Sequence, residues 1–332
     1  MNSKQSVYDV LTLGETMARL TPADFQRFGQ SRAVEMHVGG SESNTAVGLA
    51  RLGHRVCWLS RMTANPVGRW IAAEIAAQGV DVSHVLWTDQ DRVGTYYMER
   101  GRPPRDSQVF YDRAGSAMSR MQASELPTEL FTRAAAEIFH VSGITLGISP
   151  TARQTVTRAV EMAKRGGQQL SFDLNYRARL WSPEEAYAIC APIMAQADWI
   201  FLPIRDAIGV CGMAKAAAPQ EICGELHSRW PQATIVLTRG NQGATSIGQT
   251  GDLIEQTAFR AEEVERLGGG DAFSAGYLSA LLSGLDPHLS LRWACAAAAI
   301  KYTIPGDLPL LDRCVVESLV GDPMRGSAGI HR

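Results

Sequence analysis

Short apolar runs alternate along most of the chain with longer runs in which apolar residues recur at helical spacing. The short runs lie at 10–13, 56–59, 169–173, 199–202 and 233–238, and the longer ones at 44–52, 151–164, 271–282 and 289–302. Strands that alternate with amphipathic helices are typical of βαβ units. The pattern therefore predicts an α/β fold built around a mainly parallel sheet.

Turn residues indicate where one helix ends and where a hairpin forms. Gly53 follows the helical run 44–52, in the place where a glycine commonly ends a helix. Two short apolar runs at 244–247 and 253–257 flank Gln249-Thr250-Gly251-Asp252. A turn of this composition between two short runs predicts an antiparallel hairpin.

Two segments, 19–38 and 92–113, do not follow the alternation and are richer in arginine, aromatic and turn residues. We interpret them as excursions from the main domain that cover a site, with plain surface loops as the alternative. Tyr96 and Tyr97 are neighbours on a predicted strand and must point to opposite faces. Only one of them can face the site, and we choose Tyr96.

Composition limits the classes of function. The 332 residues include 32 basic and 34 acidic side chains, which gives a net charge of −2 and does not favour a general nucleic-acid or membrane binder. The six cysteines form no CxxC pair and the seven histidines no HxxxH or HxH pattern, so no structural zinc site is expected. The first residues lack the apolar run of a signal peptide, and no stretch of 18 apolar residues occurs. We expect a cytoplasmic protein whose ligand is a small molecule.

The most informative motif is Gly268-Gly269-Gly270, directly before the apolar helical run 271–282. Glycines allow a close approach of the backbone, and the amides at a helix N-terminus attract an anion. Asp271 stands at the mouth of this cradle, where a carboxylate would repel an anion. A base that accepts a proton from an attacking hydroxyl explains it better. A simple helix cap is the alternative, and the run is not a GxxxxGK[ST] P-loop.

Two signatures then point to a family. Val38-Gly39-Gly40 with Asn44, followed by Ala50-Arg51-Leu52-Gly53, resembles the N-terminal signature of ribokinase-like (PfkB-type) carbohydrate kinases. Residues 267–278 resemble the C-terminal signature of the same family. The two stand in the family's order, about 230 residues apart, and the resemblance runs over nearly the whole chain.

Within the family, the resemblance is strongest to 2-keto-3-deoxygluconate kinases. It is carried by GETMARL from residue 14, GGSESN from 39, YDRAGSA from 111, HVSGIT from 140, FDLNYRARLW from 172 and IKYTIPGDL from 300. The resemblance implies one doubly wound α/β domain over 1–320, with a small β-sheet lid in about 16–38 and 92–114. We expect the polar tail 321–332 to be loose.

The same resemblance implies phosphorylation of the terminal hydroxyl of 2-keto-3-deoxygluconate to the 6-phosphate, by ATP with Mg²⁺. A requirement for a monovalent cation stays open. By position, Asp271 matches the family's base, and the anion hole matches Gly268, Gly269 and Gly270. The substrate-binding positions match Gly40, Asn44, Tyr96, Tyr111, Arg113 and Arg177. The nucleotide-binding positions match Asn175, Thr238, Arg239, Gly240 and Gly243. No metal ligand is assigned.

The two arginines agree with an acidic substrate on physical grounds. The planar fork of an arginine binds a carboxylate through two hydrogen bonds. Arg177 follows a predicted buried strand at the end where α/β proteins bind ligands, and Arg113 is a second candidate in a separate segment. The alternative for either arginine is a surface salt bridge.

Three departures from the family pattern bear on metal and substrate. An NxxE motif that organises Mg²⁺-bound water in many relatives reads FLPIRDAIG here, with Pro203 in place of the asparagine and Asp206 near the glutamate. This leaves the handling of Mg²⁺ open. Glu265 replaces the usual aspartate before the glycine run. Arg19 stands where many neutral-sugar kinases have an acid, which favours an acidic sugar.

Other functions are weighed against this one. The substrate could be a neutral sugar such as fructose. A non-catalytic sugar- or nucleotide-sensing protein is supported by the altered NxxE segment and opposed by the intact GGGD run. A dinucleotide dehydrogenase is excluded because no GxGxxG follows the first strand. A lid with an exposed strand edge could pair with a second copy, so we expect a homodimer.

Overall fold

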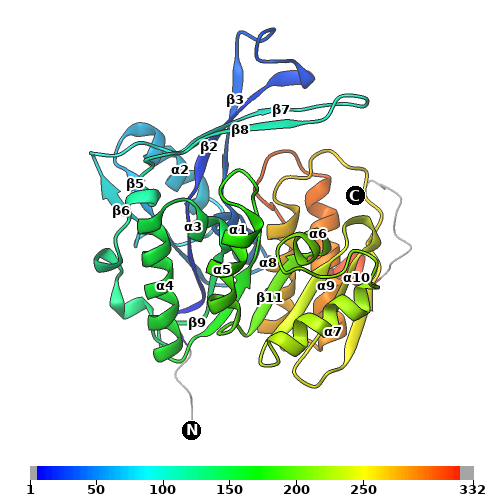
Figure 1. The fold of residues 1–332 in the computed structure, drawn as a ribbon. Coiled ribbons are helices and arrows are strands. Elements are labelled where there is room, and N and C mark those ends of the chain that lie inside the picture. Colours follow the sequence, from blue (N-terminus) through cyan, green and yellow to red (C-terminus); the bar gives the residue numbers. More distant parts are fainter. Residues whose placement is uncertain (1–5, 322–332) are drawn as a thin grey trace.

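The computed structural model describes residues 6–321, and within that range eight strands form one sheet (Figure 1). Its strands, in spatial order, are β4 (Val56–Leu59), β1 (Tyr8–Leu13), β9 (Ala136–Ser142), β10 (Gln169–Asp173), β11 (Trp199–Pro203), β12 (Thr234–Thr238), β13 (Ala244–Ile247) and β14 (Leu253–Gln256). The strands from β4 to β12 run parallel, and β13 and β14 add an antiparallel edge. The predicted mainly parallel sheet and the predicted hairpin are both confirmed.

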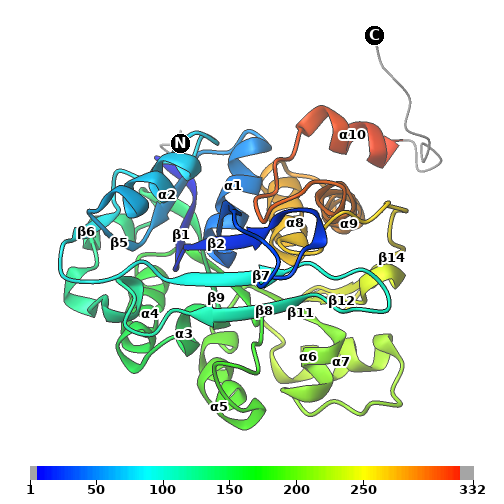
Figure 2. The ribbon, with the colours of Figure 1, turned by 90° about the horizontal axis from the view of Figure 1, so that it is seen from above.

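Helices cover both faces of this sheet, as Figures 1 and 2 show. One face carries α1 (Ser41–Arg51), α2 (Pro66–Ala76), α8 (Gly269–Leu282), α9 (Pro287–Tyr302) and α10 (Arg313–Gly321). The other carries α3 (Gly143–Gly147), α4 (Pro150–Arg165), α5 (Pro183–Met194), α6 (Ile204–Gly209) and α7 (Pro219–Arg229). The fold is therefore a three-layer, doubly wound α/β arrangement.

The core is divided between the two faces because side chains along a strand alternate. Leu11 and Leu13 of β1 belong to the hydrophobic cluster under α4 and α5. Val10 of the same strand belongs to the cluster under α1 and α8. A strand buried on both faces reads as a continuous apolar run, which explains the short apolar runs of the sequence.

A second, small sheet stands above the carboxyl ends of the parallel strands (Figure 1). Its order is β3 (Val34–Gly39), β2 (Met17–Pro22), β7 (Thr95–Glu99) and β8 (Gln108–Asp112). The two segments that broke the alternation form this sheet, so the surface-loop alternative was wrong. Tyr96 is buried, whereas Tyr97 points to the other side and packs edge-on against Phe28, with ring centroids 5.7 Å apart.

The remaining elements are short. A parallel pair joins β5 (Arg61–Thr63) and β6 (Leu86–Thr88), and 3-10 turns lie at Ala23–Phe25, Met118–Arg120, Ala123–Glu125, Thr128–Leu130 and Gly240–Gln242. All six cysteines are free, and five of them are buried. No helix within residues 6–321 has the length and apolar character needed to cross a membrane. The tail expected to be loose lies outside the described residues from position 322 onward.

Candidate active site

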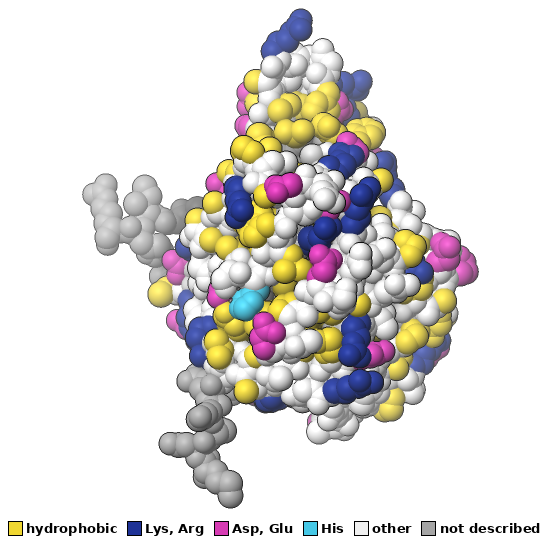
Figure 3. Space-filling model, turned by 90° about the vertical axis from the view of Figure 1, so that its left-hand side faces the viewer, with side chains coloured by type: hydrophobic (Ala, Val, Ile, Leu, Met, Phe, Trp, Pro, Cys, Tyr) yellow, Lys and Arg dark blue, Asp and Glu magenta, His cyan; other side chains and the backbone are white. Residues whose placement is uncertain are grey.

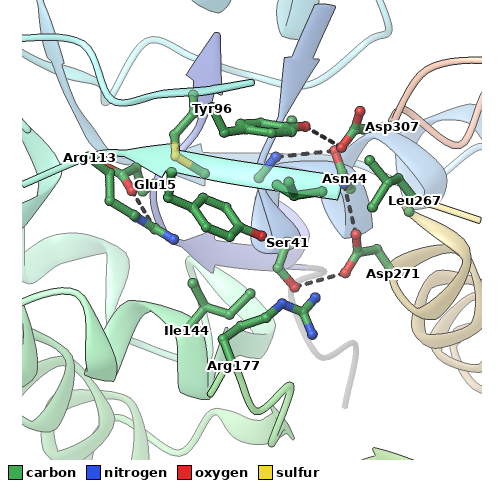
Figure 4. Close-up of a pocket in the computed structure, with 16 residues that line it drawn as sticks. Glu15, Ser41, Asn44, Tyr96, Arg113, Ile144, Arg177, Leu267, Asp271 and Asp307 are labelled. Carbon is green, nitrogen blue, oxygen red and sulfur yellow. Dashed lines mark hydrogen bonds and ion pairs between the residues drawn. The ribbon is translucent and has the colours of Figure 1, made fainter. Parts of the chain in front are cut away.

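A cavity opens between the small sheet and the N-termini of α1 and α8, at the carboxyl ends of the parallel strands (Figure 4). Open α/β sheets bind ligands at this edge. The cavity is lined by eight residues that the sequence assigned to substrate binding or catalysis: Gly40, Asn44, Tyr96, Tyr111, Arg113, Arg177, Gly268 and Asp271.

Asp271 lies in the first turn of α8, and its side chain points into this cavity (Figure 4). Its carboxylate accepts hydrogen bonds from Ser41 Oγ at 2.8 Å and from Asn44 Nδ2 at 2.7 Å. Within the described residues, no side chain caps this end of α8. The helix-cap alternative was therefore wrong, because both carboxylate oxygens are turned towards α1.

The surroundings of Asp271 have opposing effects on its pKa. Burial raises the pKa, while the hydrogen bonds from Asn44 and Ser41 and the charge of Arg177 lower it, and the net shift is upward. A raised pKa makes the carboxylate a stronger base than a carboxylate in water. This is the property that a group receiving a proton from a hydroxyl requires.

Ser41 is a site residue that sequence reasoning missed. Its Oγ donates to Asp271 and accepts from Asn175 Nδ2 at 2.8 Å, so it links the end of β10 to α8. Ser41 and Asn44 are three residues apart on α1 and share one face of that helix. That spacing, next to the already assigned Asn44, was the signal that could have identified it.

The glycine run forms a tight turn before α8. Gly268 has φ of +77°, and a Cβ at this position would lie 2.0 Å from the carbonyl oxygen of Asp307. Only glycine fits there. The first amides of a helix have no partner inside the helix. The backbone amide of Gly269 donates instead to the carbonyl of Arg266, at 3.2 Å. An anion that approaches the turn would compete with this long bond.

A buried charge network joins the small sheet to the glycine turn. Arg19 of β2 is 1% exposed and contacts two carboxylates, Asp307 at 2.6 Å and Glu265. Tyr96 of β7 donates its hydroxyl to the other oxygen of Asp307 (Figure 4). Glu265 also accepts from the backbone amide of Gly306 at 2.9 Å.

This network weakens one argument from the sequence. From the sequence, an arginine at position 19 favours an acidic sugar, because many neutral-sugar kinases have an acid there. Asp307 lies beside Arg19 and lines the cavity, so the cavity does contain a carboxylate at this place. Arg19 itself is enclosed by its partners and does not line the cavity.

The two candidate arginines differ in their partners. Arg113 pairs with Glu15, and its Nε is buried with no acceptor among the described residues. Arg177 lines the cavity, and no carboxylate lies within 4.0 Å of it in the range 6–321; its Nη1 donates only to the backbone carbonyl of Tyr176, at 3.3 Å. Figure 4 shows Arg177 directed towards Ser41 and Asp271, with Arg113 on the Glu15 side.

A second cavity lies on the other side of the glycine turn. Its lining combines Thr238, Gly240, Gly243, Gly269 and Gly270 with the side chains of Phe273, Ala298, Ala299 and Tyr302. Two residues assigned to the nucleotide do not line it. Arg239 turns its guanidinium to Glu255, at 3.1 Å, and Asn175 contacts Ser41 instead.

Two further acids lie behind the site. Asp173 ends β10, and burial together with the charge of Asp271 raises its pKa to about 8. Asp206, from the altered NxxE segment, is buried on α6 and accepts from the amide of Tyr176 at 3.2 Å. Within residues 6–321, no group of three or more His, Cys, Asp or Glu side chains is placed to hold a metal ion.

The glycine turn, the buried carboxylate and the two adjoining cavities are the arrangement of a phosphotransferase. A family model for pfkB family carbohydrate kinases matches residues 8–312. The chain belongs to this family: it is a sugar kinase with the ribokinase-like fold, and as such it uses ATP.

Individual relatives make the comparison finer. A 2-dehydro-3-deoxygalactonokinase of Haloferax volcanii is 37% identical over 324 residues, which covers 98% of this chain and 99% of the relative. A 2-dehydro-3-deoxygluconokinase of Bacillus subtilis is 28% identical over 302 residues, or 90% of this chain and 91% of the relative. The crystal structure of a 2-dehydro-3-deoxygluconokinase from Thermotoga maritima superposes with a TM-score of 0.90 at 30% identity, over 95% of this chain and all of that one.

Proposed function

We propose that this kinase transfers the γ-phosphoryl group of ATP to the terminal hydroxyl of a 2-keto-3-deoxy sugar acid, 2-keto-3-deoxygluconate or its galactonate epimer. The observation that carries the proposal is Arg177, a cation that lines the sugar cavity, acts on the charge of Asp271 and forms no ion pair within 4.0 Å among the described residues. Arg19 and Arg113, by contrast, are already paired. A guanidinium without a direct ion pair in a partly buried cavity favours an anionic ligand. The names of the two relatives above agree with such a substrate.

In the proposed reaction, the sugar acid lies in the cavity with its terminal hydroxyl at Asp271 and its carboxylate at Arg113 and Arg177. The hydroxyl oxygen attacks the γ-phosphorus and its proton passes to Asp271. The bond between the γ-phosphorus and the bridging oxygen breaks, and ADP leaves. Ser41 and Asn44 hold the carboxylate of Asp271 in place. The amides of the glycine turn stabilise the negative charge that spreads over the transferring phosphoryl group.

The second cavity suits the nucleotide. Glycines line its side next to α8, where phosphate groups can approach the backbone. Phe273, Ala298 and Ala299 supply the apolar surface that a base ring requires. Mg²⁺ usually keeps several waters and binds through substrate phosphates rather than an all-protein cage. The lack of a carboxylate cage within 6–321 therefore fits an Mg²⁺ ion that arrives with ATP and neutralises phosphate charge.

The test is a substrate panel of 2-keto-3-deoxygluconate, its galactonate epimer, fructose and ribose, with ADP formation as the readout. We expect kcat/KM for one or both keto-deoxy acids to exceed that for the neutral sugars by at least ~10²-fold, the scale of a site built for a polar group. A higher value for fructose or ribose would overturn the acidic-substrate proposal. No ADP formation with any sugar would favour a sensing protein.

Two variants assign the arginines. Arg177→Ala and Arg113→Ala should each lower kcat/KM for the keto-deoxy acid by at least ~10-fold, because each removes a charged hydrogen-bond donor. Turnover of the poorer neutral sugar should change less. An equal loss with both kinds of substrate in Arg177→Ala would instead assign this arginine to the phosphoryl group.

We also propose a homodimer formed through the small sheet, in the cytoplasm, where ATP is available. The outer strands β3 and β8 have unpaired edges, and hydrophobic side chains are visible on the projecting sheet (Figure 3). The large hydrophobic residues exposed there are Val34, Met36, Phe110 and Tyr111. Analytical ultracentrifugation tests this: Met36→Glu should shift a dimer to a monomer, and a monomeric wild type would overturn it.

A further inference from the structure

Lys301, near the end of α9, is a titratable group that the reaction described above does not use. Its side chain has no exposed surface, although lysine is seldom fully buried without a partner. The Nζ donates to the carbonyl of Ile304 at 3.0 Å. The stem packs against the back of the glycine turn, because a Cβ on Gly268 would lie 3.1 Å from Lys301 Cε.

The charges around Lys301 explain why a cation is needed at this place. Burial and the charge of Arg19 lower the pKa of Lys301, whereas the charges of Glu265, Asp307 and Asp271 favour its ammonium form; the net shift is downward. Arg19 is already shared between Glu265 and Asp307. Without Lys301, these two buried carboxylates would face one guanidinium, and the group would carry a net negative charge directly behind the glycine turn. Such a charge would oppose any anion that approaches the turn from the front.

We propose that Lys301 is a positioning residue for phosphoryl transfer: its ammonium group neutralises the carboxylates behind the glycine turn and holds Gly268 in place, so that the amides of the turn present a net positive field to the transferring group. The proposal rests on the phosphoryl transfer argued above, but not on the identity of the sugar. Lys301 lines neither the sugar cavity nor the nucleotide cavity and acts through the turn.

A purely structural role, in which Lys301 only fills space and holds the loop after α9, makes different predictions. Lys301→Met keeps most of the volume and removes the charge, Lys301→Arg keeps the charge, and Lys301→Ala leaves a cavity that methylammonium can enter. Lys164→Met is the matched control, since Lys164 pairs with Asp198 at 2.9 Å on the opposite face of the sheet.

Kinetics are measured at a temperature well below the thermal unfolding midpoint of each variant. The substrate is whichever panel sugar the wild type phosphorylates, so an error in the proposed sugar does not affect the outcome. We expect Lys301→Met to lower kcat at least ~10-fold, less than the loss of a direct oxyanion donor, with both KM values changed less than ~3-fold. Lys301→Arg should retain more activity than Lys301→Met, and methylammonium should raise kcat of Lys301→Ala but not of wild type. Lys164→Met should match the wild type.

A readout that does not depend on turnover completes the test. ADP with aluminium fluoride and the panel sugar mimics the transferring phosphoryl group, and its affinity is measured by calorimetry. Lys301→Met should bind this mixture at least ~10-fold more weakly than wild type, with affinity for ADP alone changed less than ~3-fold. The proposal is overturned if kcat of Lys301→Met stays within ~2-fold of wild type, or if methylammonium leaves Lys301→Ala unchanged.

Discussion

The two cavities share the glycine turn at 268–270 but are built from different parts. The sugar cavity is walled by ionisable side chains, most of them paired: Asp271 with Ser41 and Asn44, Arg113 with Glu15, and Asp307 with Arg19 and Tyr96. The nucleotide cavity is walled mainly by glycines, alanines and aromatic side chains.

This difference has a consequence for specificity. In the function proposed above, side-chain charges recognise the sugar, so one substitution can change which sugar is accepted. In the same proposal, backbone and apolar surface contact the nucleotide, so most side chains nearby can change with little effect, whereas added volume cannot be tolerated. We therefore expect charge-removing substitutions to affect mainly the sugar cavity and volume-adding substitutions to affect mainly the nucleotide cavity.

The largest effect is expected from Asp271→Asn on the sugar side. An amide can still contact Ser41 and Asn44 but cannot accept the proton, so kcat should fall by at least ~10²-fold, the scale of a lost general base. The midpoint of thermal unfolding should not fall, because burial makes the charged form of Asp271 costly. Near-wild-type turnover would show that Asp271 is not the base.

Arg19→Met tests the network between the small sheet and the glycine turn. It leaves Glu265 and Asp307 buried without their guanidinium, which should lower the free energy of unfolding by about 3–5 kcal/mol. Urea unfolding measures this. Arg92→Met, which breaks an exposed ion pair with Asp112 on the same sheet, is the control and should unfold like the wild type. Equal stability of both variants would contradict the importance assigned to the network.

Gly270→Ala tests the nucleotide side. A Cβ on Gly270 meets no atom within 4 Å, so the variant should fold normally, but the methyl group enters the space assigned to the nucleotide. We expect kcat/KM for ATP to fall about 10-fold, the low end of the effect of one methyl group in a binding site, with KM for the sugar within ~2-fold. Gly224→Ala, on α7 and equally unobstructed, is the control. A larger change in KM for the sugar than in kcat/KM for ATP would contradict the assignment of the second cavity to the nucleotide.

Stability also depends on pH, through Asp173. The folded-state pKa of Asp173 is raised to about 8, mainly by burial, against about 4 in an unfolded chain. The folded protein therefore binds this proton more tightly, and the contribution of Asp173 to stability is lost as pH rises from about 4 through about 8. Asp173→Asn lacks this loss. The unfolding midpoint of this variant, measured in metal-free buffer, should rise relative to that of the wild type from pH 5 to 8, and the difference should not grow further above pH 8. A difference that is the same at every pH would contradict the raised pKa.

The sequence by itself determined the layered fold and the local chemistry. Apolar runs report which segments are buried on one or both faces, so five of the six parallel strands, the hairpin and the two segments of the small sheet could be located. The remaining parallel strand, β9 (Ala136–Ser142), was missed. The glycine run and Asp271 are adjacent in the chain, so the sequence alone indicated an anion-binding turn beside a carboxylate. The sequence could not decide whether Asp271 caps its helix or acts as a base, because both roles occupy the same position.

Only the tertiary structure decided the partners. Ser41 meets Asp271 across 230 positions, and Arg19 meets Glu265 and Asp307 across 246 and 288. Lys301 reached the back of the glycine turn in the same way. Periodicity gives the face on which a side chain lies, but not what lies opposite, since that depends on how sheet and helices pack. For this reason the sequence identified the charged residues, and the fold determined which of them remain free for a ligand.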